Sequence, residues 1–171
     1  MKHIFFLTIS FVLISFSLSA QTDAIDKFFN DYKTNGDFKI ISINSKAFDL
    51  LNKATSDKDD SEFLDIVKDL KGLKILTTSK NAMLIYADAN KRVIGAGYEE
   101  LMKIRDNESN IRFVTKETNG NISELVMILG EKDNFTVLSF IGNIDLKKIA
   151  KLSKTLDVKG VEHLDKVNKK K

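Results

Sequence analysis

The sequence predicts a single α+β domain built on one mixed sheet of about five strands, with helices packed mainly on one face. Apolar residues recur at the three- and four-residue spacing of helices through the first half of the chain. In the last third they alternate with polar residues along three successive segments, as strands do. No stretch rich in Pro, Gly or Ser divides the sequence, so we expect one folding unit.

The first 20 residues have the pattern of a secretory signal. Lys2 gives a basic start, an oily run extends from Ile4 to Leu18, and small residues close the segment. We expect cleavage between Ala20 and Gln21. A membrane-spanning helix needs about 20 apolar residues, and this run falls short of that. We therefore expect an exported protein, periplasmic or extracellular, with no transmembrane segment after cleavage.

The remaining composition limits the class of protein. We expect one domain over residues 21–158 and a basic, mobile tail over residues 159–171, where lysines gather. The chain has no cysteine, so it forms no disulfide, uses no thiol chemistry and is not expected to be a lipoprotein. Its 27 basic and 24 acidic residues are interspersed, which does not indicate a nucleic-acid-binding protein.

Local patterns predict the elements of the first two thirds. Gly95 and Gly97 interrupt a helical pattern, and two glycines would cost a continuous helix about 2 kcal/mol. We therefore expect a break there and a helix that resumes at Tyr98, with Leu101 and Met102 facing inward. Apolar stripes predict helices near residues 25–32, 47–54, 63–70, 82–93 and 146–153, and alternation predicts strands near 38–43 and 73–77.

The last third predicts a three-stranded antiparallel meander. Residues 111–115 alternate, and the Asn-Gly pair at 119–120 is the strongest short signal for a tight hairpin turn. Such a turn would place Phe113 opposite Val126. Residues 135–141 form the third strand. Because these strands carry apolar residues on both faces, the meander should be central or covered on both sides.

No arrangement of residue types predicts catalysis, a cofactor or a metal. The acidic run at 57–62 lacks the glycine and the glutamate that a calcium loop requires. His163 lies beside Glu162 and Asp165, and we interpret it as a surface histidine of the tail. We therefore predict a protein that is not an enzyme, with no catalytic, cofactor-binding or metal-binding residues.

Four segments of the sequence resemble one family. They are residues 63–78, 97–105, 122–129 and 142–156. In this order they are similar to the secreted Bacteroidota family catalogued as domain of unknown function 4252. The resemblance implies a Gram-negative envelope protein and assigns no catalytic residue. Some relatives look like lipoproteins, and this chain departs from them because it has no cysteine.

Three functions remain as hypotheses. The first is an exported, non-enzymatic envelope protein that binds a protein partner or a surface through a patch near the glycine break. The second is a periplasmic carrier of a small apolar ligand, held between sheet and helices. The third is a carboxylate-dependent hydrolase, which needs two acidic side chains in one cleft. The candidate interaction patch comprises Gly95, Gly97, Tyr98, Leu101 and Arg105.

Overall fold

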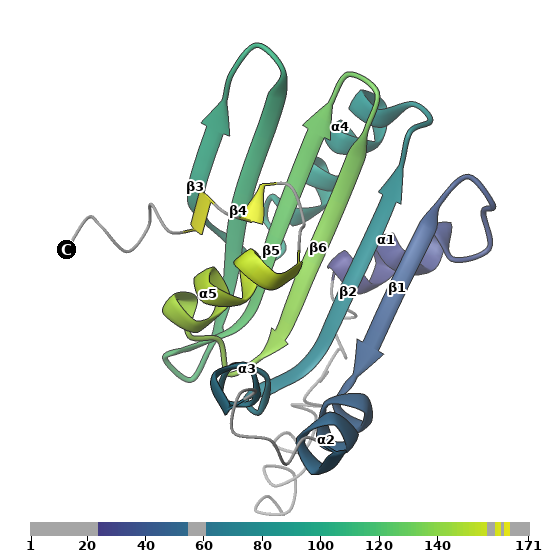
Figure 1. The fold of residues 1–171 in the computed structure, drawn as a ribbon. Helices are drawn as coiled ribbons and strands as arrows, with labels where there is room; N and C mark the ends of the chain where they lie inside the picture. Colours follow the sequence, from purple (N-terminus) through teal and green to yellow (C-terminus); the bar gives the residue numbers. More distant parts are fainter. Residues whose placement is uncertain (1–23, 55–60, 157–159, 162, 165–171) are drawn as a thin grey trace, which may run out of the picture.

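The computed structural model describes residues 24–54, 61–156, 160–161 and 163–164, so the predicted signal and its cleavage site lie outside the described residues. A six-stranded sheet runs through the centre (Figure 1), with the strand order β1-β2-β6-β5-β4-β3. No helix of this described part is long and apolar enough to cross a membrane. In chain order the elements are α1 (Ala24–Tyr32), β1 (Lys39–Asn44), α2 (Ser45–Ala54), α3 (Ser61–Val67), β2 (Leu70–Thr78), α4 (Ala82–Val93), β3 (Glu99–Arg105), β4 (Ser109–Thr118), β5 (Asn121–Glu131), β6 (Phe135–Gly142) and α5 (Leu146–Leu156).

The α+β class, the single domain and the C-terminal meander are confirmed, whereas the sheet differs in detail. It is antiparallel throughout rather than mixed. Helix α4 carries the chain across one face from β2 to the far edge, so β2 lies beside β6 and no two parallel strands become neighbours (Figure 1). The sixth strand is β3, in a segment for which the sequence pattern predicted a helix.

Helices cover both faces of the sheet rather than mainly one. Helices α1 and α4 pack on one face, and α2, α3 and α5 pack on the other (Figure 1). The cause lies in the central strands. Along β5, Val126 and Ile128 point to the α1–α4 face, whereas Leu125, Met127 and Leu129 point to the opposite face, and all five are buried. A strand that is apolar on both sides must be covered on both sides.

Strand β3 replaces the helix predicted to resume at Tyr98. Helix α4 does end at Val93, as the two glycines indicated. From Met102 to Arg105, apolar and basic residues alternate as they do in a strand. A bulge at Leu101 shifts the register between Glu100 and Met102 and places two apolar residues in succession, which hides the alternation in the sequence.

The β4–β5 hairpin has its turn at the predicted Asn119-Gly120 pair, with φ angles of 54° and 78°. Its register, however, shifts by one residue between Lys116 and Glu117, so Phe113 pairs with Met127 and not with Val126. The shift has a physical reason. Without it, Met127 would lie opposite Arg112, whereas with it the apolar rows of the two strands share one face.

The packed part of the chain continues beyond the expected domain end. Val161 and Leu164, which we assigned to a mobile tail, are fully buried in the cluster beneath α5. Gly160 lies close to Met127, because a Cβ at this position would approach the Met127 sulfur to 3.0 Å. Residues 165–171, with most of the tail's lysines, lie outside the described residues.

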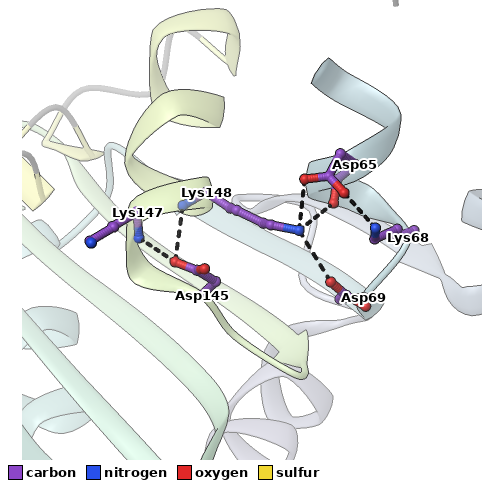
Figure 2. Close-up of polar contacts among 6 residues, drawn as sticks. All are labelled: Asp65, Lys68, Asp69, Asp145, Lys147 and Lys148. Atoms are coloured by element: carbon purple, nitrogen blue, oxygen red, sulfur yellow. Dashed lines mark hydrogen bonds and ion pairs between the residues drawn. The ribbon is translucent and has the colours of Figure 1, made fainter. Parts of the chain in front are cut away.

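An ion-pair network joins α3 to α5 (Figure 2). The Lys148 ammonium lies 2.8 Å from the Asp65 carboxylate, donates to the Asp65 carbonyl at 3.0 Å and reaches Asp69 at 3.5 Å. Lys68, one turn away, pairs with the other Asp65 oxygen. Hydrogen bonds from Lys148 and Lys68 lower the pKa of Asp65 from its usual 3.8 to about 2.

This network predicts a specific acid sensitivity. A carboxylate whose pKa is lowered on folding stabilises the folded state above its unfolded pKa, and this contribution disappears as the pH falls through the folded pKa. Urea unfolding of the natural protein should therefore lose stability between about pH 4 and pH 2. The Asp65→Asn variant should be less stable than the natural protein at neutral pH. Its free energy of unfolding should also change less with pH across that interval.

The matched control is Asp49→Asn, which removes an exposed carboxylate of α2 that has no ion pair within the described residues. Its free energy of unfolding should change with pH as steeply as that of the natural protein. Equal slopes for the natural protein and Asp65→Asn would contradict the assignment.

Candidate functional site

The five residues predicted as an interaction patch do not form one surface. Gly95 and Gly97, with φ angles of 74° and 79°, form the exposed turn between α4 and β3. Tyr98 packs against the apolar cluster beneath α1 and α4, whereas Leu101 packs against the cluster on the opposite face of the sheet. Arg105 is exposed and lines a groove on the α4 side.

This groove, which we call the α4–β3 groove, lies between the outer side of α4 and the first two strands that follow it. Its volume is about 420 Å³. Its floor is basic and its helical wall is partly apolar, which sets it apart from a purely charged surface. The lining includes Met83, Tyr86 and Asn90 from α4, and Lys103, Arg105 and Arg112 from β3 and β4.

Two hydrogen bonds fix Arg112 in the groove. Its Nε donates to Glu100 at 2.6 Å, and its Nη1 donates to the Asn90 side-chain oxygen at 3.0 Å. Asn90 is held in turn, because its amide nitrogen donates to the Tyr86 carbonyl at 2.8 Å. Arg112 is therefore a positioned cation whose charge is partly balanced by Glu100.

Lys103 and Arg105 differ from Arg112. Both are exposed, and within the described part of the chain neither has an ion pair or a side-chain hydrogen bond. The neighbouring Asp106 carboxylate turns back to accept hydrogen bonds from the backbone of Glu108 at 2.9 Å and Ser109 at 2.7 Å. These bonds lower the pKa of Asp106. The groove therefore carries two uncompensated positive charges on one side of β3.

The wall of the groove rests on a close approach of helix to sheet. A Cβ on Gly130 would lie 2.5 Å from the Tyr86 ring, so glycine at this position of β5 lets the ring lie directly on the backbone. Above it, α4 presents apolar side chains to solvent. Met83 is 43% exposed and Leu84 is 72% exposed. An apolar rim beside a basic floor is a surface suited to a protein segment.

A second polar cluster surrounds the buried Glu124 of β5. Tyr98 donates to its Oε2 and Ser139 to its Oε1, each at 2.6 Å. Lys116, opposite Glu124 in the ladder, lies 5.4 Å above the Tyr98 ring. Each carboxylate oxygen thus accepts a hydrogen bond from a side chain on the same sheet face, which is the arrangement of a structural network.

A hollow of about 250 Å³ beside this cluster places Asp26 and Glu124 on one lining. Two carboxylates in one hollow are what a carboxylate-dependent hydrolase would need. Here, however, Asp26 forms an ion pair with Lys74, and both oxygens of Glu124 accept hydrogen bonds. The geometry therefore favours charge pairing over acid–base chemistry. The described residues contain no group of three acidic or histidine side chains placed to hold a metal.

We did not predict Lys103, Arg112 or Asn90 as site residues from the sequence. The alternation from Met102 to Arg105 is the signal that could have placed Lys103 and Arg105 on one side of a strand. Asn90 and Arg112 are 22 residues apart, and their contact depends on how α4 lies on the sheet. No local pattern carries that information.

The Glu124 cluster predicts unequal costs for two tyrosine substitutions. Tyr98→Phe removes a 2.6 Å hydrogen bond to a buried carboxylate, which should lower the free energy of unfolding by about 1.5–3 kcal/mol. Tyr32→Phe removes a 3.5 Å contact with Asp88 and keeps the ring stacked on Phe38, and it should cost less than about 1 kcal/mol. Urea unfolding measures both, and equal costs would contradict the structural role of Tyr98.

Comparison with known proteins places the chain in a family without assigning it a role. Neither the curated proteins nor the solved structures contain a significant match to this sequence. A family model described as domain of unknown function (DUF4252) matches residues 32–152. The match covers the sheet and its helices from the end of α1 into α5. The chain therefore belongs to the DUF4252 family.

Proposed function

We propose that this chain is an exported, non-enzymatic protein of the cell envelope that binds another protein through the α4–β3 groove. The observation that carries the proposal is the pair of unpaired cations, Lys103 and Arg105, which line the groove together with the exposed side chain of Met83. Charged groups at the edge of an interface steer and select a partner, whereas apolar groups supply the area that it buries.

Two further observations support binding over chemistry. The carboxylates that share a hollow are occupied by Lys74, Tyr98 and Ser139. Arg112, held by Glu100 and Asn90, lines the same groove as the two exposed cations, so a carboxylate that enters the groove would meet a preorganised donor. A carrier of small apolar ligands is less well supported, because the groove floor is charged and the sheet faces are filled by their own helices.

The expected location follows from the pattern of residues 1–20. The exported form should begin at Gln21, because the basic start, oily run and small-residue end match a cleaved signal. Intact-mass measurement of the protein recovered from the envelope or medium tests this, and a mass that retains the first 20 residues would contradict export by cleavage.

Photo-cross-linking in the producing cell tests the binding surface. A photoreactive amino acid in place of Met83, which is 43% exposed, should give a discrete adduct with another protein. The matched control is the same amino acid in place of Ile41, which is 40% exposed on β1 at the opposite edge of the sheet. That control should give no adduct of the same size.

A charge-reversal pair then tests the cations. Lys103→Glu with Arg105→Glu should reduce the Met83 adduct at least fivefold, since each reversed charge costs a rim interaction of about 1 kcal/mol. Lys39→Glu with Lys71→Glu makes the same change in net charge at exposed positions of β1 and β2, and should leave the adduct intact. Absence of an adduct at Met83, or equal loss in both pairs, would overturn the proposal.

A further inference from the structure

Strand β3 forms one edge of the sheet. It pairs with β4 on one side, and among the described residues no strand lies on its other side. The backbone N–H and C=O groups of that outer edge are therefore available to an added strand. At about 3.3 Å per residue, the seven residues from Glu99 to Arg105 offer an edge roughly 23 Å long.

The two faces of β3 differ in chemistry. Lys103 and Arg105 project on the α4 side, where they line the groove. Met102 and Ile104 alternate with them along the strand. These two side chains project to the other face and pack against the apolar cluster there. A strand added to this edge would place its side chains about 5 Å from these rows. Acidic side chains of the added strand would lie beside Lys103 and Arg105, and its apolar side chains would lie beside Met102 and Ile104.

Resting on the proposed function, we infer that the partner presents an extended segment of alternating acidic and apolar residues, which adds as a seventh strand to the outer edge of β3. Its acidic side chains enter the α4–β3 groove beside Lys103 and Arg105. Its apolar side chains continue the row of Met102 and Ile104.

The opposite edge of the sheet does not offer the same match. On one face of β1 lie the uncharged polar residues Ser42 and Asn44. On the other face, Lys39 lies in the same row as Ile41 and Ile43. That edge has no row of cations. Charges on an edge strand also protect it from pairing with its own kind, because a second copy of β3 would bring like charges together. The same two charges therefore reject a second copy and select an acidic strand.

Synthetic seven-residue peptides with a fluorescent label test this by anisotropy. The first alternates Glu and Val, the second has Lys in place of each Glu, and the third has the composition of the first in two blocks. The Glu–Val alternating peptide should bind at least tenfold more tightly than the other two. The double variant Lys103→Glu, Arg105→Glu should bind the lysine peptide more tightly than the Glu–Val peptide. The control variant Lys39→Glu, Lys71→Glu should still prefer the Glu–Val peptide.

Backbone methylation of the peptide separates strand addition from simple charge attraction. In an added strand, every second peptide N–H points to the neighbouring strand. N-methyl groups at one set of alternate positions should therefore abolish binding, and those at the other set should be tolerated. Equal affinity for the acidic and lysine peptides, methylation without an alternating effect, or no binding of any peptide would overturn the inference. If the Met83 adduct persists in that case, strand addition fails and the proposed binding function stands.

Discussion

The rest of the structure depends on the burial of the two central strands from both sides. From Leu125 to Leu129, every side chain of β5 is buried, and successive side chains point to opposite faces. Each fully buried residue of this kind contributes about 1.5–3 kcal/mol, so neither face can be left to water. Helices must therefore cover both faces. The position of α4 on β5 follows from this, and so does the groove that forms where α4 stops short of the sheet edge.

Sequence patterns predicted the elements that have a local cause. The stripe from Ala82 to Val93, the glycine break after it and the Asn119-Gly120 turn each depend on a few neighbouring residues, and each was predicted correctly. The two bulges were not predictable in this way. The register shift between Lys116 and Glu117 is set by matching the Phe113 row of β4 to the Met127 row of β5, which is a relation between strands. The bulge at Leu101 likewise concealed β3.

The residues of the candidate site also differ in whether a local pattern or the tertiary fold determines their position. Arg105 was selected from the sequence for its place in a segment taken as a helix, and it lines the groove for a different reason, as part of an edge strand. Tyr98 and Leu101 were selected with it, yet Tyr98, which directly precedes β3, and Leu101, within β3, pack on opposite faces of the sheet, in two separate apolar clusters. To predict their positions, one would have to know that this segment is a strand and not a helix. The roles of Asn90 and Arg112 required knowledge of the tertiary fold, because their contact joins a helix to a strand.

The charges of the groove are a matter of arrangement and not of composition. The chain has a formal net charge of only +3, and several of its cations pair with nearby carboxylates, as Lys74 does with Asp26 and Lys148 with Asp65. Exposed ion pairs contribute about 0–1 kcal/mol, so leaving Lys103 and Arg105 unpaired costs the fold little. Two cations that contribute little to stability, on a strand that has no neighbour on its outer side among the described residues, are what the proposed binding function requires.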